Sequence, residues 1–308
     1  MSIEAIFAYL HSIDTVQWWD FAVSFTNENQ DGIMRLALVQ MNATPDREEN
    51  VERACRHIEK AADGGADLVV IPEFFNIAYP FYRQSTEIYA LAESMEGPSV
   101  TRVREAAAGR GVNLIATIYE KEAEGVFFDT SFVFDRSGGF LGRYSKVHPA
   151  GPKVSGMERL YYRGGTRFPV FTIDDWKIGI SICYDWRFPE TARCLTVNGA
   201  EIVIMPFASP YTAIWDKGVP FRAWENSIYT ATCNHVGQEE DTFFPGDSMV
   251  SDPYGEIIAH AGNEEQVIYA DLIREVLAEA HAVNGVLRDR RPEVYTALTT
   301  PMDRLRHD

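Results

Sequence analysis

The stretch KIGISICYDWRFPETARCLTVNGAEIVIMP, residues 177–206, predicts a strand, a helix and a second strand in direct succession. An apolar run covers residues 177–183, the segment 188–200 predicts a helix, and a further apolar run covers 201–206. This order is typical of an α/β fold. It places Cys183 at the point where the first strand turns into the helix.

The chain on both sides of this unit alternates between helices and strands in the same way, with hairpins mixed in. The strands are either apolar throughout or strongly alternating, which favours two sheets packed face to face with helices outside. We therefore expect an α/β fold of the four-layer α-β-β-α sandwich type. The expected strands lie at 35–41, 67–73, 112–120, 127–135, 140–146, 168–173 and 266–272, with a hairpin over 246–262 and helices at 45–66, 100–111 and 273–281.

The chain divides into three segments by composition. Residues 1–33 contain no Lys or Arg, so they do not resemble a secretory signal. Their apolar spacing predicts a helical N-terminal extension, and TNENQDG predicts a linker. Residues 34–284 form the main domain, and residues 285–308 form an Arg-rich C-terminal tail.

Composition excludes several classes of protein and partner. The 308 residues carry 28 Lys and Arg against 45 Asp and Glu, a formal net charge of −17. Such an acidic chain repels nucleic acid and anionic membrane surfaces, and no apolar run is long enough to span a bilayer. The four cysteines include no CxxC pair, which argues against disulfides and structural zinc and favours a cytoplasmic location.

Cys183 and two other residues follow predicted strands directly. Glu73 ends the strand DLVVIPE, and Lys146 ends FLGRYSK in a chain with few lysines. A thiol beside a helix N-terminus is expected to have a lowered pKa. Each residue also has an ordinary explanation, as a structural cysteine, a loop glutamate or a surface lysine. For the other three cysteines, Cys55, Cys194 and Cys233, we expect a buried structural role inside a helix or strand.

Taken together, these residues and their surroundings resemble the nitrilase superfamily of carbon–nitrogen hydrolases over residues 34–295. The resemblance implies a Glu-Lys-Cys triad of Glu73, Lys146 and Cys183 on an α-β-β-α fold. It is carried by the motifs LALVQMNATPDREEN (36–50), LVVIPEFF (68–75), RYSKVHP (143–149), ISICYDWRFPE (180–190), GAEIVIMP (199–206) and DSMVSDPYGEII (247–258).

The same resemblance suggests roles for further residues. Glu158, in GMERLYYRGG (156–165), matches a second glutamate that positions Lys146 or the substrate. The backbone N–H of Tyr184 would share the oxyanion with Lys146, and no metal or cofactor is implied. His148 and Arg187 match substrate-binding places of the N-carbamoyl amidohydrolase branch, with a structural imidazole and a structural ion-pair partner as the alternatives. The expected pocket walls are Phe74, Phe75, Tyr79 and Trp215.

The segment after the nucleophile bears on the substrate. Tyr184 and Asp185 stand where true nitrilases typically carry Trp-Glu, which favours small carboxamides or N-carbamoyl compounds over nitriles. Nitrile hydrolysis, a glutaminase-like subunit that supplies ammonia, and a non-enzymatic thiol or interaction protein are the alternatives. The tail 285–298 resembles an extension that crosses to a neighbouring subunit, so we expect a homodimer or a higher homo-oligomer.

Overall fold

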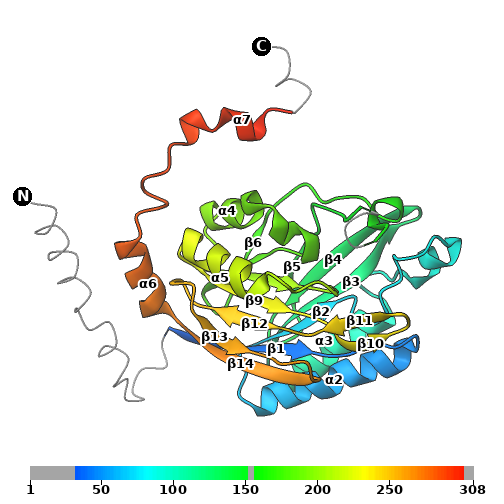
Figure 1. Cartoon of the computed structure of the whole chain (residues 1–308). Coiled ribbons are helices and arrows are strands. Elements are labelled where there is room, and N and C mark those ends of the chain that lie inside the picture. The colour runs from blue at the N-terminus through cyan, green and yellow to red at the C-terminus, as the bar shows by residue number, and fades with distance from the viewer. Residues whose placement is uncertain (1–31, 152–155, 302–308) are drawn as a thin grey trace, which may run out of the picture. The chain divides into compact units, whose positions relative to one another are not determined.

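The computed structural model describes residues 32–151 and 156–301 (Figure 1). The helix predicted within residues 1–33 lies outside the described residues. From Ile33 onward the described chain forms two six-stranded sheets and a short two-stranded hairpin.

The first sheet has the strand order β14-β1-β2-β3-β4-β5. Its inner strands β1, β2 and β3 run parallel, while the remaining neighbours pair antiparallel. The strands are β1 (Ile33–Gln40), β2 (Leu68–Glu73), β3 (Asn113–Ala123), β4 (Val126–Phe134), β5 (Phe140–Ser145) and β14 (Gln266–Ile273).

The second sheet repeats this pattern with the order β13-β12-β9-β8-β7-β6. Its strands β7, β8 and β9 are parallel and are flanked by antiparallel neighbours. The strands are β6 (Val170–Ile173), β7 (Trp176–Ile180), β8 (Ile202–Pro206), β9 (Tyr229–Cys233), β12 (Met249–Ser251) and β13 (Ile257–His260).

The central core lies between the two sheets. Leu36 and Val70 from the first sheet share a buried cluster with Ile178 and Ile204 from the second. Because side chains alternate along a strand, their neighbours Ala37 and Val69 point to the other face of the first sheet. Full burial of one such aliphatic side chain contributes about 1.5–3 kcal/mol.

Helices cover the outer faces of both sheets. The helices α2 (Arg47–Asp63) and α3 (Pro98–Arg110) bury Ile58 and Val103 against the first sheet. Leu195 of α4 (Pro189–Val197) and Val219 of α5 (Trp215–Asn226) pack on the second. Figure 1 shows the two helix pairs on opposite sides of the sheets. The predicted four-layer α-β-β-α sandwich is therefore confirmed.

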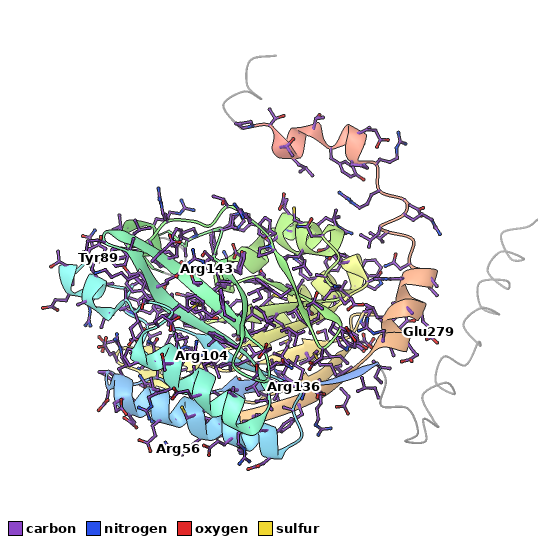
Figure 2. All side chains as sticks on the ribbon, turned by 180° about the vertical axis from the view of Figure 1, so that it is seen from behind. Arg56, Tyr89, Arg104, Arg136, Arg143 and Glu279 are labelled. Carbon is purple, nitrogen blue, oxygen red and sulfur yellow. The ribbon has the colours of Figure 1, made fainter. Side chains whose placement is uncertain are left out.

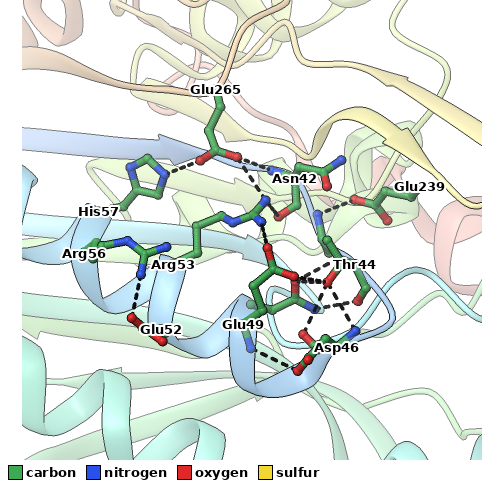
Figure 3. Close-up of polar contacts among 12 residues, drawn as sticks. Asn42, Thr44, Asp46, Glu49, Glu52, Arg53, Arg56, His57, Glu239 and Glu265 are labelled. Carbon is green, nitrogen blue, oxygen red and sulfur yellow. Dashed lines mark hydrogen bonds and ion pairs between the residues drawn. The ribbon is translucent and has the colours of Figure 1, made fainter.

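Local signals explain where α2 begins. The Asp46 side chain accepts a hydrogen bond from the Glu49 backbone N–H at 3.1 Å, as an N-cap does (Figure 3). Such a cap contributes about 1 kcal/mol. The first turn also carries Glu48 and Glu49, which complement the positive end of the helix dipole.

Ion pairs on the surface join elements of different sheets. Arg136 lies in the turn between β4 and β5 (Figure 2). It pairs with Asp67 at 2.7 Å and with Asp174 at 2.6 Å. Asp67 precedes β2 of the first sheet, whereas Asp174 lies in the β6–β7 turn of the second. This contact therefore links the two sheets at the edge of the sandwich.

The structure differs from the sequence prediction in two places. The strand expected over 177–183 ends at Ile180, and Cys183 opens a 3₁₀ turn, η4 (Cys183–Arg187), before α4 begins. A hairpin of β10 (Val236–Glu239) and β11 (Thr242–Pro245) was not predicted. Its turn holds Glu240 at a φ of 46°, without the glycine that usually marks such a turn.

The C-terminal part continues after β14 with α6 (Arg274–Val283), η5 (Pro292–Val294) and α7 (Thr296–Thr299). Its apolar side chains Val294 and Leu298 are exposed. The role of this tail at a subunit interface stays a prediction. In the described part of the chain, no helix has the length and apolar character needed to cross a membrane.

Candidate active site

Glu73, Lys146 and Cys183 meet where their strands end. Glu73 is the last residue of β2, Lys146 follows β5 directly, and Cys183 begins η4 shortly after β7. Glu73 and Lys146 are fully buried, and Cys183 is 4% exposed. Phe74 and Cys183 both adopt left-handed backbone conformations, with φ of 56° and 44°. Such strained non-glycine residues concentrate at functional sites.

The Lys146 ammonium lies among buried carboxyl groups. Its Nζ is 2.8 Å from Glu73 Oε1, 2.9 Å from Glu158 Oε2 and 3.2 Å from Asp129 Oδ2. Burial disfavours the charged amine, but Glu158 and Glu73 outweigh it and raise the pKa of Lys146 well above its usual value. The lysine is therefore a fixed positive charge at neutral pH.

Glu73 is held through all of its acceptor groups. Oε1 accepts from Lys146, and Oε2 accepts from the Ala208 backbone N–H at 2.6 Å. The backbone carbonyl of Glu73 accepts from His235 Nε2 at 2.5 Å. The Cys183 thiol lies close enough to the Glu73 side chain for the carboxylate to raise the pKa of the thiol. The Glu73 carboxylate is thus held by an ammonium and a backbone N–H in the neighbourhood of the thiol.

The Cys183 thiol does not have the low pKa that the sequence predicted. Burial of the sulfur and the nearby Glu73 carboxylate raise its pKa well above the usual value, although Lys146 opposes them. The expectation failed because Cys183 opens a short 3₁₀ turn in a buried acidic setting, and α4 begins only at Pro189. A protonated thiol needs a base before it can attack, and Glu73 is a carboxylate near enough to raise the pKa of this thiol.

Glu158 occupies the opposite side of the lysine. It starts η3 (Glu158–Leu160) and accepts from the Tyr79 hydroxyl at 2.8 Å and the Ala150 backbone N–H at 2.6 Å. Burial alone would favour the neutral acid, but Lys146 together with hydrogen bonds from Tyr162 and the Ala150 backbone N–H lowers the pKa of Glu158. Glu158 is therefore an ionised neighbour of the ammonium.

Asp185 links the segment that contains Lys146 and His148 to the turn η4, which begins at Cys183. Its Oδ1 accepts from the His148 backbone N–H at 2.9 Å and lies 2.6 Å from His148 Nδ1. Its Oδ2 accepts from the Tyr144 hydroxyl at 2.5 Å and the Ile182 backbone N–H at 3.2 Å. Because His148 and Tyr144 flank Lys146, this carboxylate sets the position of one loop against the other.

Comparison with known proteins identifies the family. The model of the family described as carbon-nitrogen hydrolase matches residues 35–282, most of the chain. The chain belongs to the carbon-nitrogen hydrolase family. Glu73, Lys146, Cys183 and Glu158 all lie within the matched region.

Similar carbon-nitrogen hydrolases include proteins of more than one named activity. The omega-amidase of Xenopus tropicalis is 35% identical over 271 residues, which cover 85% of this chain and 96% of that protein. The nitrilase of Pyrococcus abyssi is 33% identical over 273 residues, covering 85% and 99%. The solved amidase from Nesterenkonia sp. AN1 in complex with acrylamide has a TM-score of 0.76 at 27% identity and covers 89% of this chain and 100% of that chain.

Not every residue expected in the pocket lies at this cluster of the carbon-nitrogen hydrolase. Arg187 is exposed, and its guanidinium lies 5.8 Å from the ring centre of Tyr184. Within the described residues, Arg187 makes no hydrogen bond or ion pair to the cluster. Trp215, the first residue of α5, is buried with its ring 4.2 Å from that of Phe207, and its role as a pocket wall stays a prediction. Phe75 packs on the helix side of the first sheet.

Other expected residues do lie beside the cluster. The rings of Phe74 and Tyr79 are 6.0 Å apart in a buried aromatic group, and Tyr79 contacts Glu158. Tyr184 follows Cys183 in η4. His148 stacks on Phe188 at 3.9 Å and contacts Asp185, as expected for the structural alternative. The substrate-binding role of His148 stays a prediction.

Sequence reasoning missed Asp129 and His235. Asp129 lies inside β4, where aspartate is uncommon, and its burial beside Lys146 depends on the pairing of β4 with β5. A charged residue within a strand that is apolar at both ends was a signal that could have been used. Cys194 was also misjudged, because it is exposed on α4.

Proposed function

We propose that this carbon-nitrogen hydrolase cleaves a small carboxamide or N-carbamoyl compound through a thioester on Cys183 and releases ammonia. The observation that carries the proposal is the buried ion pair of Glu73 and Lys146, with 2.8 Å between Oε1 and Nζ, in the neighbourhood of the buried Cys183 thiol, whose pKa both groups influence. Glu73 can then exchange a proton with the Cys183 thiol, and the Lys146 ammonium lies where it can stabilise negative charge on the reacting carbonyl oxygen. No step requires a group outside the chain except the substrate and water.

Acylation begins with the buried thiol. Glu73 accepts the Cys183 proton, and the thiolate attacks the carbonyl carbon to give a tetrahedral oxyanion. Lys146 and the Tyr184 backbone N–H stabilise that oxyanion, and a donor of this kind supplies about 3–4 kcal/mol. The protonated Glu73 then gives its proton to the leaving nitrogen. A carboxamide loses ammonia, and the acyl group remains on sulfur.

Deacylation uses the same carboxylate. Glu73 takes a proton from water, the oxygen attacks the thioester, and the second tetrahedral oxyanion forms in the same place. Collapse releases the acid, and Glu73 returns the proton to the Cys183 sulfur. With an N-carbamoyl substrate the group on sulfur is a carbamoyl group, so its hydrolysis yields carbon dioxide and ammonia after the amine has left.

Both substrate classes have support. The named activities of the omega-amidase and the Nesterenkonia amidase favour a carboxamide. The N-carbamoyl class rests on the resemblance of the segments around His148 and Cys183 to that branch. Nitrile hydrolysis is the second candidate, because one similar protein is named a nitrilase.

Ammonia release from a defined panel tests this proposal. The panel contains carboxamides including glutamine, N-carbamoyl amino acids, N-carbamoyl amines and nitriles, with carbon dioxide measured for the carbamoyl compounds. We expect release by the wild type and loss in Cys183→Ala, while Cys194→Ser, at an exposed thiol, stays unchanged. Equal release by Cys183→Ala would refute the mechanism.

A further inference from the structure

Asp129 is a buried carboxyl group to which the steps above assign no role. It faces Lys146 across the end of the β4–β5 pair, where the Lys146 backbone N–H donates to the Asp129 carbonyl at 2.9 Å. Its Oδ2 is 3.2 Å from Lys146 Nζ, and the residue is fully buried. Within the described residues, its other oxygen, Oδ1, receives no hydrogen bond. A buried carboxylate oxygen left without a donor needs an explanation.

The neighbouring Glu73 explains why Asp129 Oδ1 receives no hydrogen bond from any described residue. The Asp129 and Glu73 side chains approach the same Lys146 Nζ, at 3.2 Å from Oδ2 and 2.8 Å from Oε1, so two buried carboxyl groups lie next to each other. Two carboxylates can share a hydrogen bond only if one of them carries a proton. Both Glu73 oxygens already accept, from Lys146 and from the Ala208 backbone N–H. Asp129, with an oxygen that no donor reaches, is the better place for that proton.

The charges around Asp129 agree with this assignment. The side chains that face it are Glu73 from β2, Lys146 after β5, Glu158 from η3, Tyr162 after η3 and Tyr144 from β5. Burial and the negative charge of Glu73 raise the pKa of Asp129 well above its usual value, with Lys146 opposing. With Asp129 neutral, one ammonium faces two buried carboxylates rather than three.

We propose that Asp129 is a positioning residue, a neutral carboxylic acid in the resting enzyme whose O–H donates to Glu73 and holds it against the Cys183 thiol. This inference rests on the proposed function, in which Glu73 is the base. It adds that the proton of the two neighbouring carboxyl groups resides on Asp129. It also adds a titration: once Asp129 ionises, the hydrogen bond to Glu73 is lost and turnover falls.

The near-isosteric variant Asp129→Asn separates this role from a structural one. An amide N–H can still donate to Glu73, and its oxygen can still accept from Lys146, but the group cannot ionise. We expect turnover at pH 7 within about threefold of the wild type, and an alkaline limb of the pH profile that moves up by about one pH unit or more. The control Glu124→Gln, an exposed carboxylate on the β3–β4 turn, leaves the profile in place.

An infrared difference spectrum gives a readout that needs no substrate. At pH 7 the wild type minus Asp129→Asn spectrum is expected to contain the carbonyl band of a protonated carboxyl group, and the Glu124→Gln difference is not. If the protein hydrolyses none of the panel, the band still tests the protonation of Asp129, so the two proposals fail separately. The inference is overturned if the band is missing, if Asp129→Asn loses about 100-fold or more of the turnover, or if the alkaline limb does not move.

Discussion

The Nζ atom of Lys146 lies 2.8 Å from Glu73 Oε1, and both side chains are fully buried although 73 positions separate them in the chain. Burial of a charged pair is costly unless each charge is matched. Here the ammonium is matched by Glu73 and Glu158, so its removal leaves carboxylates without a partner. We therefore expect turnover and the free energy of unfolding to be most sensitive to replacement of Lys146.

Replacing Lys146 tests that sensitivity. Lys146→Ala is expected to lower turnover about 100- to 1000-fold through loss of the oxyanion partner, and to lower the free energy of unfolding by about 3–5 kcal/mol. Lys146→Arg is not expected to rescue turnover, because the broad planar guanidinium group cannot take the place of the compact ammonium group. Ammonia release and urea unfolding measure both effects. Lys121→Ala, which removes an exposed ion pair with Glu124, should change neither, and comparable losses there would contradict the account.

Asp185 offers a test of how the two loops are held together. Asp185→Asn keeps the shape, but it has only one acceptor oxygen for the donors from His148, Tyr144 and Ile182. We expect a loss of about 2–3 kcal/mol in urea unfolding and a fall in kcat, because buried donors are left unpaired. Asp216→Asn, on the exposed start of α5, is the control. A normal kcat in Asp185→Asn would show that the hydrogen bonds of Asp185 do not position Lys146 and Cys183.

The pair of His235 and Glu239 predicts a pH dependence of stability. Both ring nitrogens of His235 contact acceptors at 2.5 Å, Glu239 Oε1 and the Glu73 carbonyl, so both must carry protons. Burial opposes the charged ring, but Glu239 outweighs it and raises the pKa of His235. A raised pKa in the folded state gives stability that is complete below the unfolded value of about 6.5 and is lost as pH rises through the folded pKa.

Urea unfolding of the wild type and Glu239→Gln over a pH series measures this contribution. Glu239 also accepts from the Ala43 backbone N–H at 3.0 Å, a contact that the glutamine oxygen can keep (Figure 3). The difference in unfolding free energy should be largest below about pH 6.5 and should shrink as the histidine loses its proton. A difference that stays constant across the series would mean that His235 is neutral throughout.

Labelling of thiols tests whether Glu73 activates Cys183. Because Cys194 is exposed and Cys183 is nearly buried, the two must be separated in a Cys194→Ser background. In that background, Glu73→Gln should slow iodoacetamide labelling of Cys183 about tenfold or more, since the protonated thiol loses its base. Peptide mass spectrometry follows each cysteine. An unchanged rate in Glu73→Gln would remove the basis for general-base activation.

Much of this site could be predicted from sequence because its key residues follow apolar strands. Glu73, Lys146 and Cys183 each stand at or shortly after the end of a strand, where α/β folds place their binding sites. The apolar runs likewise predicted the layers, since strands buried on both faces need cover on each side.

The rest depends on pairings that no local pattern reveals. Asp129 joins the site only through the register of β4 with β5, and Asp185 acts through the loop that contains His148. Ser181 and Ile182 continue the apolar run but not the strand, because Cys183 takes a left-handed conformation that turns the chain. The exposure of Cys194 depends on which face of α4 packs on the second sheet.

The most direct test of the account is the mass of the protein during turnover. The enzyme is mixed with a carboxamide that the panel identifies, quenched in acid at a series of times, digested and measured by mass spectrometry. We predict an acyl group on the peptide that contains Cys183, at times when ammonia is being released, and none on the same peptide of Cys183→Ala. An acyl group on another side chain, or steady ammonia release with no acyl group on the protein at any time, would contradict the central claim.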